Sequence, residues 1–159
     1  GAIADVRRLH FRAAEGGEMA NCLSTRGLLM GADTWLRSGG FRPHWLPHYL
    51  SDYEFTLRLQ RQGVPLTTDP RFHLVTNSAT TGDEAFDGRG LRHFIDRTLS
   101  NRAMYNPMHW SALALLVSPP WIAPWLVLRM WLSFARRAMR VALSPVGRLT
   151  AVEPERNQR

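Results

Sequence analysis

The chain has 159 residues, a length that predicts one domain, or one domain with an appendage, and that suffices to bury a hydrophobic core. Its single cysteine, Cys22, excludes a framework of intrachain disulfides and indicates a reducing compartment. The formal net charge is +7, and all 20 basic residues are arginine. Residues 105–159 hold seven arginines and two acidic residues, an excess that suits an anionic membrane surface or nucleic acid, although solubility alone would also explain it.

The first 50 residues predict short strands and one short helix. The chain begins at Gly1 with no charged and then apolar leader, so we expect no signal peptide and expect that the N-terminal part of a longer protein is missing. Residues 6–13 predict a strand that is followed by a turn at residues 16–17. Residues 21–30 predict a second extended stretch, which a polar group at its centre interrupts.

A short helix is expected to follow, with Asp33 as its N-cap and Gly39-Gly40 at its end. Residues 41–50 contain two prolines and several aromatic residues, and we expect an ordered loop there.

The strongest helix signal begins at Ser51. Ser51 and Glu54 have the S-x-x-E spacing of a capping box, in which each side chain satisfies a free backbone N–H group. Phe55 and Leu59 follow at i and i+4, and Gly63 is expected to end the helix. Two short strands, residues 64–68 and 72–76, are predicted next, and residues 77–90 predict a mobile loop.

The C-terminal third is predicted to be helical, beginning with a helix over residues 91–105. The uncharged stretch 103–128 is long enough to span a bilayer, but the prolines at 119, 120 and 124 would interrupt a spanning helix. Two shorter helices, residues 107–117 and 121–141, are predicted instead. The second has the pattern of a helix in a membrane interface, which is also the pattern of a helix packed on the domain through its apolar side. Its polar stripe consists of Arg129, Ser133, Arg136, Arg137 and Arg140.

Four pieces of sequence between residues 21 and 77 occur in an order that resembles a known family. They read NCLSTRGLLM, ADTWLRSGGF, SDYEFTLRLQRQG and VPLTTDPRFHLV. This order resembles the second half of the catalytic domain of inverting family 2 glycosyltransferases of the GT-A type, and within that family the rhamnosyltransferase-like bacterial enzymes. The resemblance implies an α/β fold that is the C-terminal part of a GT-A, or nucleotide-diphospho-sugar transferase, fold with short strands. An amphipathic helical tail would follow it.

The resemblance also implies a division of the chain and a metal-dependent donor site. Residues 1–105 would form the acceptor-side half of the domain, residues 106–143 a helical, membrane-apposed segment, and residues 144–159 a disordered tail. Family members bind a nucleotide-sugar donor and a divalent metal, Mg or Mn, through a D-x-D motif. No D-x-D motif occurs in this chain, so we expect it to be inactive without a missing N-terminal half.

Asp52 is the candidate catalytic base. Inverting transfer needs one base to deprotonate the acceptor hydroxyl group, and the family places that base at the second residue of a carboxylate pair, which here reads Ser51-Asp52. A carboxylate in the first turn of a helix is held rigidly and lies at the positive end of the helix dipole. Asp and Glu also occur in first turns purely for capping, which is the structural alternative for Asp52.

The remaining candidate residues are substrate-binding, and each has a structural alternative. Two glycines could let a sugar approach the backbone or could end a helix, and two residues of the 24–27 loop could touch the donor or form an ordinary turn. Two aromatic residues could stack on sugar rings or simply pack in a loop. Glu54 is mainly structural with a possible acceptor contact, and Arg58 could contact donor phosphates or pair with Glu54. These candidates are Gly39, Gly40, Thr25, Arg26, Trp45, Tyr49, Glu54 and Arg58.

No metal ligand is assigned. Many family members carry a His near the end of the strand at 72–76, where Asn77 stands here and His73 comes earlier. The six histidines and one cysteine are scattered without zinc-site spacing.

The predicted function is transfer of a sugar from a nucleotide-sugar donor to a glycan or lipid-linked acceptor in cell-envelope polysaccharide synthesis. The expected location is the cytoplasm, peripherally on the inner face of the cell membrane. The alternative is a non-catalytic, membrane-associated interaction domain with a glycosyltransferase-like shape. No nucleic-acid partner is expected, because the chain shows no recognition motif for one and its tail tryptophans suit a lipid interface better.

Overall fold

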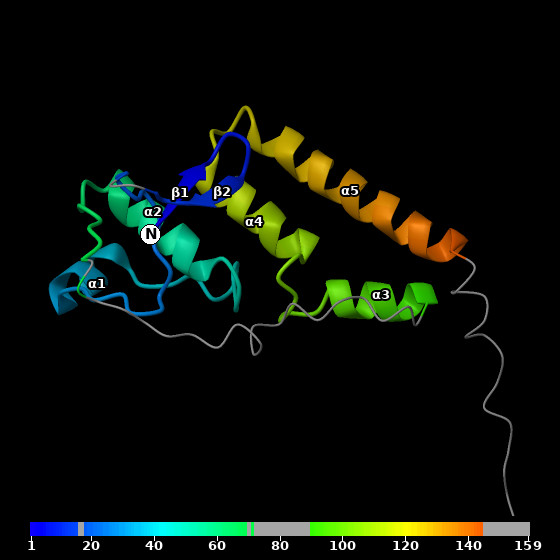
Figure 1. The fold of residues 1–159 in the computed structure, drawn as a ribbon, viewed down its shortest axis with the longest axis horizontal. Coiled ribbons are helices and arrows are strands. Elements are labelled where there is room, and N and C mark those ends of the chain that lie inside the picture. The colour runs from blue at the N-terminus through cyan, green and yellow to red at the C-terminus, as the bar shows by residue number, and fades with distance from the viewer. Residues whose placement is uncertain (16–17, 70, 72–89, 145–159) are drawn as a thin grey trace, which may run out of the picture.

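Helices predominate in the computed structural model, which describes residues 1–15, 18–69, 71 and 90–144 (Figure 1). The elements in chain order are β1 (Ala2–Asp5), β2 (His10–Ala13), α1 (Ala32–Ser38), α2 (Ser51–Arg61), α3 (Gly90–Thr98), α4 (Pro107–Val117) and α5 (Ala123–Leu143). The described residues therefore combine strands with helices in a mixed, helix-rich architecture. That they form part of a larger GT-A fold stays a prediction.

The first two elements form an antiparallel hairpin rather than one strand over residues 6–13. β1 pairs with β2 so that Ala2 faces Ala13 and Asp5 faces His10. The connection turns because the Asp5 carboxylate accepts hydrogen bonds from the backbone N–H groups of Arg7 (2.9 Å) and Arg8 (3.2 Å). The strand prediction was therefore right for residues 10–13 and wrong for residues 6–9.

The segment after the hairpin touches the sheet at one point instead of forming a long extended stretch. An isolated bridge joins Ala2 to Cys22, and the Asn21 side chain hydrogen-bonds both the N–H (2.7 Å) and the C=O (3.0 Å) of Ala4. The chain turns after Thr25, whose C=O accepts from the N–H of Leu28 at 3.2 Å. The extended prediction for residues 21–30 thus holds only at its beginning.

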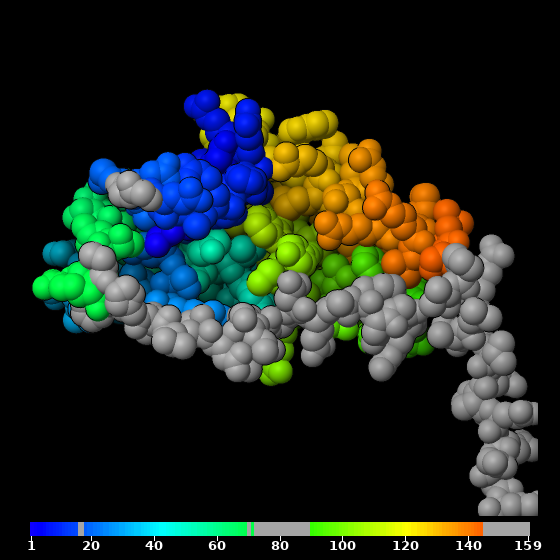
Figure 2. Space-filling model, viewed as in Figure 1, coloured from blue at the N-terminus to red at the C-terminus, as the bar shows by residue number. Residues whose placement is uncertain are grey.

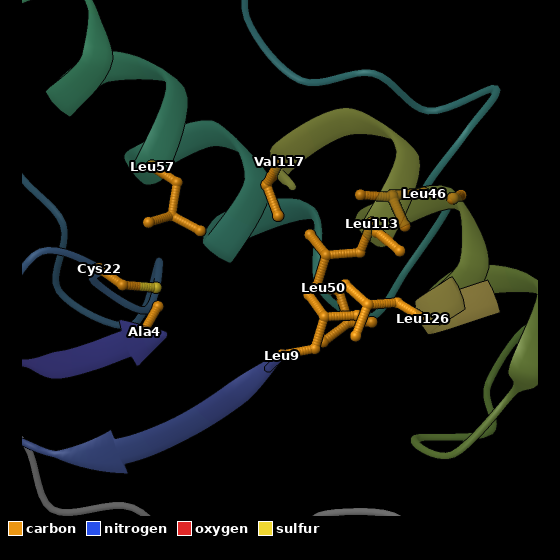
Figure 3. Close-up of a cluster of buried hydrophobic side chains, with 11 residues drawn as sticks. Ala4, Leu9, Cys22, Leu46, Leu50, Leu57, Leu113, Val117 and Leu126 are labelled. Atoms are coloured by element: carbon orange, nitrogen blue, oxygen red, sulfur yellow. The ribbon is translucent and has the colours of Figure 1, made fainter. Parts of the chain in front are cut away.

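α4 lies at the centre of the hydrophobic core and packs against both α2 and α5 (Figure 1). Leu113 and Val117 of α4 are almost completely buried, and they share one cluster with Leu57 of α2 and Leu126 of α5 (Figure 3). α4 has buried residues on nearly every side, and this is why its sequence is apolar without a polar face. The helix therefore belongs to the same core as α2, although the prediction placed a domain border at residue 105/106.

The prolines separate α4 from α5 as expected. α4 begins at Pro107 behind the cap Asn106, whose side-chain oxygen accepts from the N–H of Met108 at 2.8 Å, and it ends at Val117. α5 then runs from Ala123 to Leu143 along one edge of the molecule (Figure 2). The prediction of two helices in place of one spanning helix is confirmed. Within the described residues, no helix is both long enough and apolar enough to cross a membrane.

Two other predicted elements differ from the structure. The helix expected over residues 91–105 ends at Thr98. The Asn106 side-chain NH2 group donates hydrogen bonds to the C=O groups of Leu99 and Ser100, both at 3.0 Å, and these bonds stabilise a turn there. Residues 64–68 form no strand and pair with neither β1 nor β2. The strand predicted at 72–76, most of the loop at 77–90 and all but the first residue of the 144–159 tail lie outside the described residues.

Candidate functional site

The predicted capping box at the start of α2 is not formed. The N-cap is Leu50, in the left-handed conformation (φ 69°) and without a side-chain cap, and the Ser51 hydroxyl group donates to the C=O of His48 at 3.0 Å. Glu54 does not reach back to the helix start, because its buried carboxylate binds Arg58. A charge-assisted pair in the interior is stronger than a cap at the surface, which explains why Glu54 turns inward.

Asp52 is half-buried in the first turn of α2 and faces the loop that precedes α1. One carboxylate oxygen accepts from the N–H of Tyr53 at 2.9 Å, and the other lies 3.4 Å from the N–H of Thr25. Thr56 strengthens the same junction, since its hydroxyl group donates to the C=O of Asp52 (2.9 Å) and accepts from the N–H of Leu23 (3.0 Å). The structure therefore brings Asp52 close to the loop that carries Thr25 and Arg26. Thr25 and Asp52 are 27 residues apart along the chain.

Two hollows share this loop as a common wall. The larger, about 540 Å³, is lined by Ser24, Arg26 and Tyr53 together with both strands of the hairpin. The smaller, about 300 Å³, is lined by Thr25, Trp35 and Phe41. Asp52 lines neither hollow itself, but its bonded partner Thr25 and its neighbour Tyr53 line one each. The carboxylate is thus placed beside two spaces that a small polar molecule could enter.

Four aromatic residues line these hollows, Phe11, Trp35, Phe41 and Tyr53, and none of them was a candidate site residue from the sequence. Trp35 and Phe41 meet edge to face with ring centroids 5.1 Å apart, and both pack on the buried Phe55. Tyr53 stacks on Phe11 at 4.9 Å, and burial raises the pKa of its hydroxyl group. The only sequence signal for Trp35 and Phe41 was their position on either side of the Gly39-Gly40 turn, and nothing in the sequence linked Tyr53 to the hairpin.

Arg58 and Glu54 form a closed structural unit. The Arg58 Nε lies 2.9 Å from Glu54 Oε1, and Glu54, only 2% exposed, is also approached by Arg42 at 3.5 Å. The other Arg58 nitrogens donate to the C=O groups of Ser38 and Gly40. Each guanidinium nitrogen already has a protein acceptor. In this arrangement Arg58 serves as the partner of Glu54 and as the clamp of the glycine turn, and a contact with donor phosphates would require breaking these bonds.

The two glycines act as the end of α1. Gly39 is the left-handed C-cap (φ 74°), and its N–H donates to the C=O of Leu36 at 3.3 Å. Gly40 is also left-handed (φ 62°), and a Cβ atom there would lie 2.9 Å from the Trp35 ring. The helix-end alternative therefore accounts for both glycines, and a close approach of a sugar to their backbone stays a prediction.

Trp45 and Tyr49 lie apart from the two hollows. Trp45 is 53% exposed in the turn after Arg42, and Tyr49 packs against the core and stacks on His48 with centroids 4.8 Å apart. Neither residue lines the spaces beside Asp52. Their predicted stacking on sugar rings is therefore not part of the site that the structure assembles around Asp52.

The described residues do not fit a metal ion. They contain no group of three or more His, Cys, Asp or Glu side chains placed to hold one, and the acidic neighbour Glu54 is already paired inside the core. Cys22 is buried beside Thr56, and burial raises the pKa of its thiol to about 12. His73 and Asn77, weighed for a metal role from the sequence, lie outside the described residues. We derive no chemical step through a metal from these side chains.

Comparisons of the chain with known protein families, with curated proteins and with solved structures give no match.

Proposed function

We propose that this chain is the acceptor-side half of an inverting glycosyltransferase domain and that Asp52 is its general base. The observation that carries the proposal is the junction between α2 and the 23–28 loop. There a half-buried carboxylate is fixed by the N–H groups of Tyr53 and Thr25 at the border of two hollows. The order of the four sequence pieces supports the same assignment, because it places Asp52 where family 2 enzymes carry their base.

The chemistry asked of Asp52 is a single proton transfer. As the acceptor hydroxyl oxygen attacks the anomeric carbon, its proton passes to the Asp52 carboxylate, and the bond from that carbon to the nucleotide diphosphate breaks with inversion. The two backbone N–H groups leave lone pairs on both carboxylate oxygens free to accept this proton. They also limit rotation of the carboxylate, so that it is aimed before the acceptor arrives.

The hollow beside Thr25 is the proposed place of the acceptor sugar. Trp35 and Phe41 line it, and aromatic rings offer sugars a large apolar contact area. The nucleotide-sugar donor and its Mg or Mn ion are proposed to bind to a D-x-D segment that this sequence does not contain.

The lipid side of the proposal rests on α5. Its arginines are exposed, and so are several large apolar residues, among them Trp125 (62%) and Met139 (62%). This combination suits a helix that lies on an anionic membrane, such as the inner face of the cell membrane, near a glycan or lipid-linked acceptor. The same surface also favours the second candidate, a membrane-associated interaction domain without catalysis, because it does not depend on Asp52.

The test is the variant Asp52→Asn in the full-length protein that contains this segment, assayed for sugar transfer from nucleotide-sugar donors. We expect turnover to fall at least about 100-fold, since loss of a general base typically costs ~10²–10⁴. The matched control is Asp33→Asn, which removes an exposed carboxylate from the first turn of α1 and should leave turnover unchanged. The isolated 159-residue chain is not the assay material, because we expect it to be inactive alone.

Normal turnover in a folded Asp52→Asn protein would refute the role of Asp52. Absence of any sugar transfer by the full-length protein, with intact vesicle binding, would favour the non-catalytic interaction domain.

A further inference from the structure

A groove of about 850 Å³ lies between α3 and α5, away from Asp52. Its floor is formed by α4 and by the segment that joins α3 to α4. Seven large apolar or aromatic side chains line it, namely Leu9, Phe94, Met104, Tyr105, Trp110, Met130 and Phe134. Its volume falls within the ~300–1,000 Å³ that is usual for sites of small organic ligands. We call it the α3–α5 groove.

The charged side chains that the structure describes along the α3–α5 groove are all arginines, Arg97 among them. Arg102 comes from the segment before α4, and Arg129 and Arg137 come from α5. None of the described residues that line the groove is acidic, and in the described part of the chain no carboxylate pairs with these three arginines. Arg129 donates to the C=O of Arg8 (2.6 Å) and Arg137 lies over the Tyr105 ring, which holds both at the border of the groove. An occupant with a negative head therefore matches the groove electrostatically.

The lining also restricts which class of molecule can lie along the apolar wall of the groove. A peptide or a nucleic-acid strand would bring backbone polar groups that need partners along their whole length. The apolar wall offers few, because the Trp110 Nε1 already donates to the C=O of Met104 at 2.9 Å and the remaining large side chains are almost entirely hydrocarbon or sulfur. A hydrocarbon chain needs no hydrogen bonds and gains free energy from burial there.

We propose that the α3–α5 groove is a binding site for a single phosphate-headed membrane lipid, whose alkyl chain lies on the apolar wall and whose phosphate binds the arginines. Arginine is suited to this because its planar guanidinium group donates two parallel hydrogen bonds to phosphate oxygens. Such a site differs from general adsorption of α5 to a charged surface, since it binds one lipid molecule with a defined stoichiometry. It is independent of sugar transfer and of Asp52.

The probe is a short-chain phosphatidic acid kept below its micelle concentration, titrated into the 159-residue chain and followed by NMR or calorimetry. We expect saturable binding of one molecule. Phosphatidylcholine with the same chains tests whether the net negative charge of the head group is needed. Inorganic phosphate tests whether the alkyl chain is needed. A fatty acid tests whether a carboxylate can replace the phosphate. All three should bind at least about tenfold more weakly than phosphatidic acid.

Two pairs of variants locate the site. Ser133→Phe places a ring in the groove, whereas Ala135→Phe places the same ring on the exposed surface of α5 outside it. Arg102→Gln with Arg137→Gln removes two groove charges, whereas Arg136→Gln with Arg140→Gln removes two exposed charges of α5 that do not line the groove. Circular dichroism confirms that each variant is folded.

The groove variants should weaken binding at least about tenfold, and the matched variants should change it less than about twofold. Equal losses in both charge pairs would overturn the proposal in favour of general attraction to positive charge. Tighter binding of an acidic peptide or of single-stranded DNA than of phosphatidic acid would overturn it in favour of another class of partner. If Ser133→Phe leaves binding intact, the lipid does not lie in the groove.

Discussion

The start of α2 and the length of α5 use the same residue, arginine, in opposite ways. Around α2, Arg58 is largely enclosed, and its guanidinium group is bound to Glu54 and to two C=O groups of the glycine turn. On α5, Arg136 and Arg140 are exposed, no acidic residue shares the helix, and large apolar side chains are exposed beside them. In the first arrangement, the charges of Arg58 and Glu54 are paired with each other inside the protein. The second leaves charge and apolar surface for something outside it.

This difference indicates which region is expected to determine stability and which is expected to bind a partner. A closed network helps to determine which conformation the chain adopts, and here it joins α2 to the glycine turn. The exposed face of α5 contributes little to the fold, and attachment to a membrane is the role that we propose for it. Substitutions should therefore damage stability around α2 and damage partner binding on α5, and four experiments test that separation from the largest expected effect to the smallest.

Replacing Arg58 by Met should cause the largest loss of stability. The substitution leaves the buried Glu54 with only Arg42 at 3.5 Å and frees two C=O groups, and breaking a buried ion pair typically costs about 3–5 kcal/mol. Chemical denaturation measures the free energy of unfolding. The control is Arg37→Met in the exposed last turn of α1, which should change it by at most about 0.5 kcal/mol. Equal effects of the two variants would mean that the Glu54–Arg58 pair is not enclosed.

Replacing Arg129, Arg136, Arg137 and Arg140 together by Gln should abolish binding to anionic vesicles. Each arginine near an anionic surface contributes about 1 kcal/mol, so the four contribute up to about 4 kcal/mol, roughly a thousandfold in the binding constant. Flotation with vesicles of increasing anionic lipid content is the measurement, and added salt should weaken binding by the wild type.

The unfolding free energy of this fourfold variant is its internal control and should change far less than that of Arg58→Met. If the wild type floats with no vesicle composition, α5 is not a membrane-binding surface. Release by detergent alone would instead mean that the segment spans the bilayer.

Replacing Asn106 by Ala should lower the unfolding free energy by about 2 kcal/mol. Asn106 caps α4 through the N–H of Met108, and its amide also binds two C=O groups at the end of α3 while being 1% exposed. Asn101→Ala, at an exposed position of the same connection, is the control. A loss no larger than that of the control would show that α4 does not need this cap.

Replacing Ser51 by Ala should have the smallest effect, about 0.5 kcal/mol or less. The sequence pattern predicted a cap and hence a loss of about 0.5–2 kcal/mol. The structure shows only one exposed hydrogen bond from Ser51 to the C=O of His48. A shift of the denaturation midpoint as large as that of Asn106→Ala would instead show that Ser51 caps α2, as the sequence pattern predicted.

The helices could be predicted from the sequence because their signals are local. The prolines at 119, 120 and 124, the spacing of apolar residues and the glycines after α1 each act on neighbouring residues, and the bounds of α4 followed from them. The start of α2 was predicted at Ser51, but from a capping box that is not formed. The hairpin was harder, because its turn depends on how one side chain, Asp5, binds the backbone two and three residues later. The strand predicted at residues 64–68 failed because a strand needs a partner, and pairing is not encoded locally.

The candidate site shows the same limit. Asp52, Thr25 and Arg26 were singled out by their order in the sequence, and the structure brings them together through Thr56, a contact that no spacing rule anticipates. Trp35, Phe41 and Tyr53 were missed because they line the hollows through tertiary packing alone. Glu54 was taken for half of a capping box because the sequence pattern does not reveal which arginine lies near a carboxylate in space.

The bond from the Ser118 hydroxyl group to the C=O of Val6, at 2.6 Å, joins residues 112 positions apart. During synthesis, at about 5–20 residues per second, Val6 in the turn of the hairpin is made roughly 6–22 s before Ser118. Asn21, Cys22 and Tyr53, which contact the hairpin strands, are made within that interval, whereas α4 and Ser118 follow only at its end. α4 and α5, in contrast, are neighbours in sequence and can pair as soon as both have emerged. The turn of the hairpin is therefore expected to gain its bond to Ser118 late in folding, after the two strands have met Asn21, Cys22 and Tyr53.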